Sequence, residues 1–188
     1  SRPAAAPHAG RPRLIHISNF RPVKRVTDCI RILAAVRREV DAELWLAGDG
    51  PDRSAAEQLA HELGIHPHVS FLGKQSHIER LLPQADVLLL PSQLESFGLA
   101  ALEAMACGVI PVATRVGGLP EVITPGVDGF LEEPGDVEAQ ARRAVEILSS
   151  SVLRSRMRLA ARRAAEQRFC TSRIIPLYER FYESVLQS

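Results

Sequence analysis

The chain is poor in the features that stabilise secreted domains or cross membranes. It has three cysteines in 188 residues, widely scattered along the sequence. We therefore expect neither a disulfide framework nor a clustered zinc site, and we expect all three thiols to be reduced. The longest apolar stretches, such as Val87 to Leu90 and Val109 to Val112, are far shorter than the roughly 20 residues that span a bilayer. With no signal-like start, the sequence predicts a cytoplasmic protein without a membrane span.

An excess of charge of either sign is also lacking. Lys and Arg number 23 against 22 Asp and Glu, which gives a formal net charge of +1. This balance offers no case for nucleic acid or a membrane surface as a partner. We expect no metal site, because His61, His66, His68 and His77 form no convincing ligand cluster.

Alternating short apolar runs and helical patterns are what the sequence does contain, and this order produces a parallel sheet covered on both faces. We expect strands at Leu14–Ile17, Ala42–Ala47, His68–Leu72, Ala85–Leu90, Val109–Ala113 and Gly129–Leu131. We expect helices at Val26–Val40, Asp52–Leu63, His77–Leu82, from after Phe97 to Cys107, and at Leu119–Ile123, Val137–Leu148 and Val152–Phe169. The predicted fold is α/β, a Rossmann-like doubly wound parallel sheet that binds ligands outside the carboxyl ends of its strands.

Both ends of the chain differ from this core. Residues 1–13 are rich in Ala, Pro and Arg and predict a linker or an appended remnant. We expect the domain itself over residues 14–170. Residues 171–188 predict a C-terminal helix with more apolar surface than one core needs, so it packs either on a neighbouring domain or on its own sheet.

Two glutamates, Glu95 and Glu103, flank a predicted loop-to-helix junction. The backbone amides of Phe97, Gly98 and Leu99 would be unpaired at the helix start and would suit a diphosphate. Carboxylates accept hydrogen bonds from vicinal hydroxyls, so the pair could bind a hexose on one side of the phosphates and a ribose on the other. From spacing alone, an ordinary capped surface helix with a solvated acid is the alternative.

Other loops fall at the same predicted edge of the sheet. Arg21, Lys24 and Arg25 precede a helix start, where cations oppose the helix dipole and so favour a bound anion, although a solvated basic helix start is equally compatible. Such cations could neutralise a diphosphate and stabilise a departing nucleotide. Turns after the second and third strands would let the backbone approach a planar base. These turns contain Gly48, Gly50, Gly73, Lys74 and Gln75.

Several motifs, in order, resemble the C-terminal domain of retaining, nucleotide-sugar-dependent group 1 glycosyltransferases with the GT-B fold. They are Gly48–Pro51, Phe71–Gly73, Leu90–Ser92, Glu95–Glu103, Glu103–Gly108 and Val116–Glu121. The resemblance implies one half of a GT-B fold, with the acceptor bound mainly by a missing N-terminal domain. We therefore expect this chain to bind a nucleotide-sugar donor without turning over alone, and it could self-associate as a homo-oligomer.

The resemblance also implies residue roles. Glu95 would contact the donor hexose, Glu103 the ribose hydroxyls and Lys24 the diphosphate, with Glu95 and Lys24 as the catalytic residues. The amides at 97–99 would hold the phosphates, and the base would lie against residues 73–75 with 48–50 nearby. The family pattern has an arginine where this chain has Asn19. The candidates for the second diphosphate contact are therefore Asn19, Arg21 and Arg25.

In finer detail, Ile17–Arg25 and Phe71–Gln75 are similar to a branch of the family that transfers N-acetylglucosamine to L-malate in bacillithiol synthesis. This implies UDP-N-acetylglucosamine as the donor, with no metal required. UDP-glucose, ADP-glucose or GDP-mannose would be the donor in other branches. Two other classes remain, a non-catalytic nucleotide-binding or interaction module and a dinucleotide-dependent oxidoreductase, and the latter would need a Gly-x-Gly-x-x-Gly turn after the first strand that is absent here.

Overall fold

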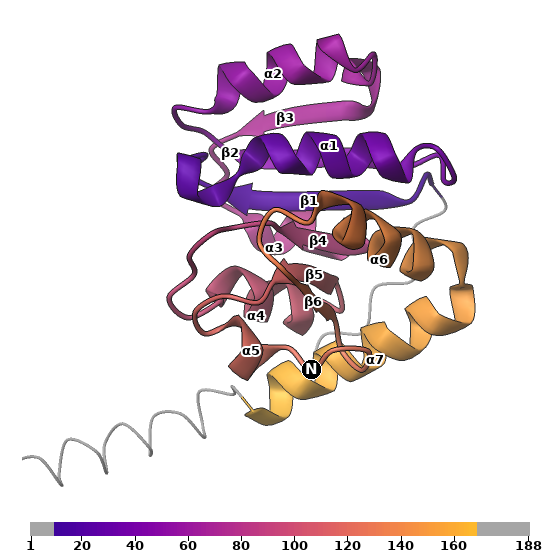
Figure 1. The fold of residues 1–188 in the computed structure, drawn as a ribbon. Helices are drawn as coiled ribbons and strands as arrows, with labels where there is room; N and C mark the ends of the chain where they lie inside the picture. The colour runs from indigo at the N-terminus through magenta and orange to yellow at the C-terminus, as the bar shows by residue number, and fades with distance from the viewer. Residues whose placement is uncertain (1–9, 169–188) are drawn as a thin grey trace, which may run out of the picture.

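A parallel sheet of six strands runs through the described part of the chain, residues 10–168 of a computed structural model (Figure 1). The spatial order is β3-β2-β1-β4-β5-β6, and every neighbouring pair is parallel. The strands are β1 (Arg13–Ser18), β2 (Glu43–Gly48), β3 (Val69–Gly73), β4 (Val87–Leu90), β5 (Ile110–Thr114) and β6 (Phe130–Glu132). The chain order therefore reverses between β1 and β4, which is the switch point where doubly wound folds bind ligands.

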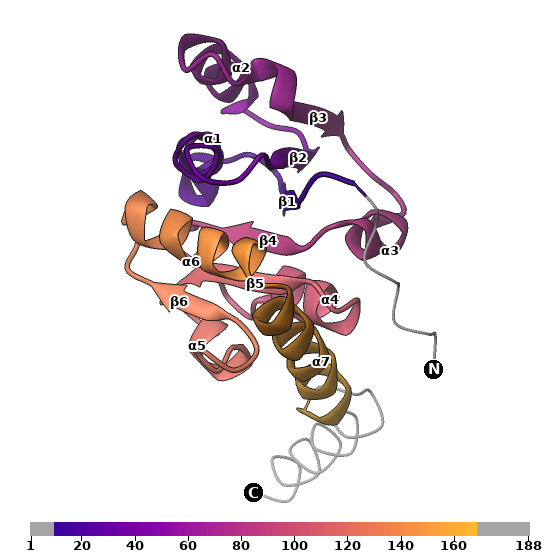
Figure 2. The same ribbon diagram turned by 90° about the vertical axis from the view of Figure 1, so that its right-hand side faces the viewer.

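Helices cover both faces of the sheet (Figure 2). The helices packed on one face are α1 (Val26–Val36), α2 (Arg53–Glu62) and α6 (Val137–Ser149). Those on the other face are α3 (Ile78–Leu81), α4 (Leu99–Ala106) and α5 (Leu119–Val122). The long helix α7 (Ser151–Arg168) contacts both layers, with Met157 in the first and Ala161 in the second. Short 3-10 turns occur at η1 (Pro22–Lys24), η2 (His66–His68) and η3 (Leu82–Gln84).

Alternation along β1 and β4 divides the core into two layers. Leu14 and Leu89 point into the layer under α1 and α6, whereas Ile15 and Leu88 point into the layer under α4 and α7. All four side chains are completely buried. This alternation is the expected result of the two-residue period of a strand whose faces are both covered.

The predicted doubly wound sheet is confirmed, and most predicted boundaries lie within two residues of the observed ones. The first helix is shorter than predicted, because it ends at Val36 rather than Val40. Arg37 explains this end: its Nη1 atom donates to the carbonyl of Ala42 at 2.6 Å and to Asp41 at 2.8 Å, which stabilises a turn instead of another helical turn.

Three predictions concern the ends and the cysteines. Cys29 is a buried free thiol, and Cys107 lies half-buried at the C-cap of α4. Cys170 and the predicted helix over 171–188 lie outside the described residues. Residues 1–9 of the predicted linker also lie outside them. Between residues 10 and 168, no helix is long and apolar enough to cross a membrane.

Candidate functional site at the switch point

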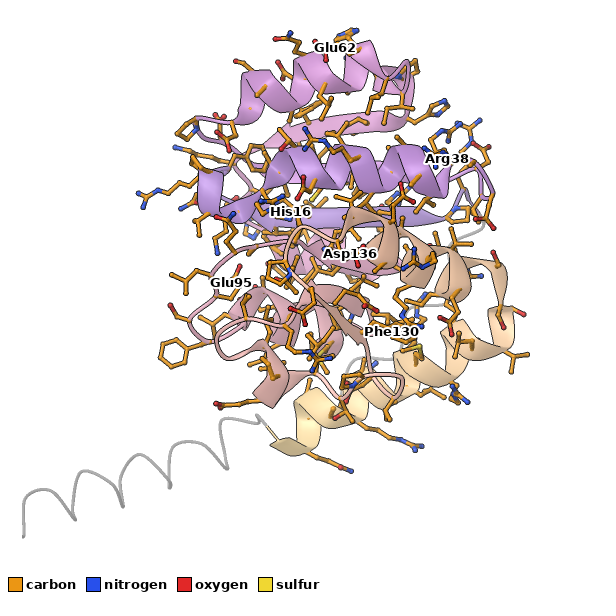
Figure 3. All side chains as sticks on the ribbon, viewed as in Figure 1. His16, Arg38, Glu62, Glu95, Phe130 and Asp136 are labelled. Carbon is orange, nitrogen blue, oxygen red and sulfur yellow. The ribbon has the colours of Figure 1, made fainter. Side chains whose placement is uncertain are left out.

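The loops that follow β1 and β4 meet at the switch point. Lys24 lies in η1 after β1, and Glu95 lies in the loop after β4. Their side chains form an ion pair with 2.6 Å between Lys24 Nζ and Glu95 Oε1, and they are 22% and 14% exposed. Glu95 lies on the left-hand side of Figure 3, toward which the β3 arrow points in Figure 1. A cation and a carboxylate from loops 71 residues apart are thus placed side by side at the carboxyl edge of the sheet.

Backbone hydrogen bonds fix these loops to one another. The amide of Gln93 donates to the carbonyl of Val23 at 2.8 Å, which joins the loop after β4 to η1. The amide of Gly118, at the start of α5, donates to the carbonyl of Glu95 at 3.2 Å. Gly117 packs against the same carbonyl so closely that an added Cβ would overlap it. The position of Glu95 is therefore set by main-chain contacts from both sides.

Two hydroxyl groups hold Glu95 in place, one directly and one through Ser92. Ser92 Oγ donates to Glu95 Oε1 at 2.8 Å, and Thr114 Oγ1, from the end of β5, donates to the carbonyl of Ser92 at 2.6 Å. Both Ser92 and Thr114 are buried. The sequence motif around Ser92 was visible, but its bond to Glu95 depends on how the loop turns back after β4.

A first hollow, of about 330 Å³, opens beside the ion pair. The helix α4 begins here, with Gly98 at its N-cap in the left-handed conformation (φ 65°). Within the described residues, the amides of Phe97, Gly98 and Leu99 donate no hydrogen bond. They therefore provide donors at the positive end of the helix dipole. The hollow is lined by Asn19, Arg21, Val23, Lys24 and residues 94–100.

A second hollow, of about 270 Å³, lies beside the first, and Asn19 lines both. Glycine is required at its floor, since a Cβ on Gly48 would overlap the carbonyl oxygen of Ser18. Gly50 packs in the same way against the carbonyl of Asn19. The lining residues are Ile17, Ser18, Asn19, Ala47, Gly48, Asp49, Lys74, Gln75 and Ile78.

Glu103 lies in a different place from Glu95. It lines a third hollow of about 420 Å³, together with Ser76, Glu79 and Cys107. Ile78 lines both this third hollow and the second one. The two glutamates therefore belong to opposite ends of a series of three neighbouring hollows.

Two other predicted site residues have other surroundings. Arg25, at the N-cap of α1, donates from Nε to Asp28 Oδ2 at 2.6 Å, and it does not line the three hollows described above. Gly73 ends β3 with φ 67°, and an added Cβ there would meet open space. The role predicted for each stays a prediction.

His16, in the middle of β1, is a neighbour of the site that the sequence analysis did not single out. It is completely buried, and burial lowers its pKa from 6.5 to about 4. This value is the net result of four effects: burial is the largest and the charge of Lys24 also lowers the pKa, whereas the hydrogen bond to Leu89 and the charge of Glu95 raise it. The imidazole is therefore neutral at pH 7. Figure 3 shows His16 left of centre, on the same side as Glu95.

No group of three or more His, Cys, Asp or Glu side chains able to hold a metal ion is present between residues 10 and 168.

The chain resembles known proteins along most of its length. A family model described as glycosyl transferases group 1 matches residues 2–164. N-acetyl-alpha-D-glucosaminyl L-malate synthase from Bacillus anthracis is 47% identical over 174 residues, which cover 93% of this chain and 46% of that protein. D-inositol 3-phosphate glycosyltransferase from Mycobacterium ulcerans is 40% identical over 143 residues, 72% of this chain and 30% of the relative.

Solved structures show the same fold. Anabaena HepE in complex with UDP superposes with a TM-score of 0.85 at 27% identity, covering 96% of this chain and 50% of that chain. S. aureus TarM, solved with UDP, has a TM-score of 0.84 at 18% identity and supports the fold alone. The chain spans half or less of the length of each of these four proteins.

Proposed function

This chain belongs to the glycosyl transferases group 1 family, and we propose that it forms the donor-binding half of a retaining glycosyltransferase that uses a UDP-sugar. One observation carries the proposal. Lys24, Glu95 and the amides of residues 97–99 converge on one hollow at the switch point of the sheet. A cation, a carboxylate and a helix start together match a sugar diphosphate, which carries both negative charge and hydroxyl groups.

The diphosphate is placed in the first hollow. The amides of Phe97, Gly98 and Leu99 donate to its oxygens, and Lys24 neutralises its charge. Arg21 lines the same hollow and Asn19 forms its wall. Of the three candidates for the second diphosphate contact, these two are better placed than Arg25, whose guanidinium is bonded to Asp28.

The sugar and the nucleoside extend to opposite sides of the diphosphate. Glu95 accepts hydrogen bonds from hexose hydroxyls, since its carboxylate is held in place by Ser92 and lines the first hollow. The base lies in the second hollow against Lys74 and Gln75. Glu103, in the third hollow that Ile78 connects to the second, accepts hydrogen bonds from the ribose hydroxyls.

Transfer then depends on positioning and on charge. As the bond between the anomeric carbon and the diphosphate oxygen breaks, negative charge grows on the departing diphosphate. Lys24 and the helix-start amides stabilise this charge, which lowers the barrier without a covalent enzyme intermediate. The leaving diphosphate takes the proton of the attacking acceptor hydroxyl on the same face, which gives retention of configuration. No metal is required in this scheme.

N-acetylglucosamine is the proposed sugar and L-malate the proposed acceptor. The support is the 47% identity to the Bacillus anthracis enzyme whose name states these groups. Because the chain spans 46% of that enzyme, we assign acceptor binding to a second domain. The 188-residue chain would then bind the donor but not transfer the sugar to malate.

Calorimetric titration of the chain tests this proposal. UDP and UDP-N-acetylglucosamine should bind, with ADP-glucose, GDP-mannose and NAD weaker or silent. Tight binding of NAD with no response to UDP would refute a donor site. Sugar transfer to malate by this chain alone would refute the division of labour between two domains.

A further inference from the structure

The imidazole ring of His16, in β1, forms a hydrogen bond to the neighbouring strand β4. The register of these strands pairs Leu14 with Val87 and Ile15 with Leu88. At the next position, the side chain of His16 makes the contact between the two strands: its Nδ1 atom lies 2.9 Å from the carbonyl oxygen of Leu89. His16 thus joins the two strands, close enough to Lys24 and Glu95 for both charges to act on its ring.

The partners of the His16 ring determine which of its nitrogens donates and which accepts. A carbonyl oxygen only accepts, so Nδ1 carries the hydrogen and donates to Leu89. In the neutral ring, Nε2 must then accept, and it lies 2.8 Å from Ser18 Oγ. Ser18 therefore donates its hydroxyl hydrogen to His16, and its oxygen accepts from the amide of Phe20 at 3.1 Å. The chain of bonds runs from β4 through His16 to the loop after β1.

That loop needs support because its backbone is unfavourable. Phe20 has φ 43°, a left-handed conformation that a bulky side chain rarely adopts. Its ring is completely buried and stacks near the His16 ring, with 6.1 Å between centroids. Asn19, which lines the first and second hollows, lies between the two residues that this hydrogen-bonded turn joins.

We propose that His16 is a positioning residue for the donor site, which holds the Ser18–Phe20 turn, and with it Asn19, in the shape that borders both hollows. This inference rests on the proposed function. The neutral ring is essential to it, because protonation of Nε2 would remove the acceptor for Ser18. The charged side chains that act on the ring are Lys24 and Glu95, and their effects on its charge oppose each other.

A purely structural role for His16 makes a different prediction. A polar residue that only fills the core lowers the stability of the whole domain when it is replaced, without a local effect on the loop. Ser18→Ala separates the two alternatives, because it removes the hydroxyl that links His16 to the Phe20 amide but leaves the imidazole of His16 in the core. Val36→Ala, a truncation of a buried core residue at the far end of α1, is the matched control for general loss of stability.

The test compares the wild-type chain with Ser18→Ala, His16→Leu, His16→Gln and the Ser18→Ala/His16→Leu double variant. Amide hydrogen exchange of the peptide covering residues 18–25 is followed by mass spectrometry, and UDP binding by calorimetry. We expect Ser18→Ala and His16→Leu to raise exchange in this peptide selectively and to weaken UDP binding by about 5–10-fold. His16→Gln, which keeps a donor and an acceptor, should recover part of the loss.

The double variant should bind UDP no more weakly than the worse single variant, because both substitutions interrupt the same chain of hydrogen bonds from Leu89 to Phe20. Val36→Ala should lower stability without selective exchange at 18–25. Unchanged local exchange in Ser18→Ala and His16→Leu would overturn the inference whatever happens to UDP. Absence of UDP binding by the wild-type chain would instead overturn the proposed function, and the exchange result would still decide the role of His16.

Discussion

Lys24 Nζ and Glu95 Oε1 lie 2.6 Å apart, so the residue that we assign to the diphosphate is the direct neighbour of the residue that we assign to the sugar. Both side chains are largely buried, and Glu95 has a second partner in Ser92. Removal of one member leaves the other charge without its main partner. Ser92 still holds Glu95 when Lys24 is replaced, so the two substitutions can be compared for their separate effects on the diphosphate and the sugar.

Loss of the Lys24 charge should weaken binding of every ligand that carries the diphosphate. We expect Lys24→Met to lower the affinity for UDP and for UDP-N-acetylglucosamine by similar factors, about 10-fold or more. Lys24→Arg keeps the charge and should retain part of the binding. Calorimetry on both ligands measures this. Wild-type affinity in Lys24→Met would remove Lys24 from the site.

The two glutamates should act on different ligands because they line different hollows. Glu103→Ala should weaken binding of UDP, since it removes a ribose contact. Glu95→Ala should reduce the affinity for UDP-N-acetylglucosamine by about 5–10-fold, because one to two hydrogen bonds to the hexose are lost. The affinity for UDP should fall less. Equal losses for both ligands in both variants would refute this assignment of roles.

Acidification should weaken the fold through His16. Its pKa is about 4 in the folded chain, against 6.5 for an unperturbed histidine. The unfolded chain therefore binds a proton first as the pH falls, and the stabilisation present above pH 6.5 is lost progressively down to pH 4. The loss is on the order of 3 kcal/mol, at about 1.4 kcal/mol for each unit of pKa difference.

Urea unfolding of the wild-type chain and of His16→Gln at several pH values checks this expectation. Other titrating groups are common to both proteins, so the difference between their free energies of unfolding isolates His16. As the pH falls from 7 to 4, the free energy of unfolding of the wild type should decrease more than that of His16→Gln. A pH-independent difference would show that the ring titrates normally.

Gly117 should be intolerant of a side chain. Its φ is 51°, and an added Cβ would overlap the carbonyl of Glu95. Gly117→Ala should therefore lower stability by well over the roughly 1 kcal/mol of the backbone conformation and should displace Glu95. Gly126→Ala is the matched control, because Gly126 has φ 77° and open space around a Cβ. Thermal unfolding and UDP-N-acetylglucosamine titration compare the two, and similar losses would contradict the steric explanation.

Much of the fold follows from local pattern. Buried strands of a parallel sheet are short and continuously apolar, so Val87–Leu90 and its neighbours could be recognised, and the alternation with helices predicts the topology. The loops that hold Lys24 and Glu95 follow from the same logic, because carboxyl ends of parallel strands share one edge. The sequence already places Glu95 and Glu103 on opposite sides of the diphosphate. The lining of the hollow at Glu103, with Ser76 and Glu79, was not predictable, since it depends on how α4 packs.

His16 shows a different kind of omission. A histidine in an apolar strand gives little local signal, and its partner Leu89 is 73 residues away. Only the spacing of two between His16 and Ser18, which places both on one face of β1, was available as a clue. The pairing of Arg25 with Asp28 has the i, i+3 spacing of a helical ion pair and was in principle visible.

Asn19 borders the first and second hollows at once, and this imposes a constraint on how such a domain can change its donor. With the base and the diphosphate in the hollows that we propose, a substitution there would alter selectivity for the base and affinity for the diphosphate together, so neither property could be tuned alone at this position. Lys74 and Gln75 line the second hollow and are exposed. Evolution or laboratory selection toward another nucleobase would therefore proceed more freely through residues 74 and 75, with Asn19 left unchanged.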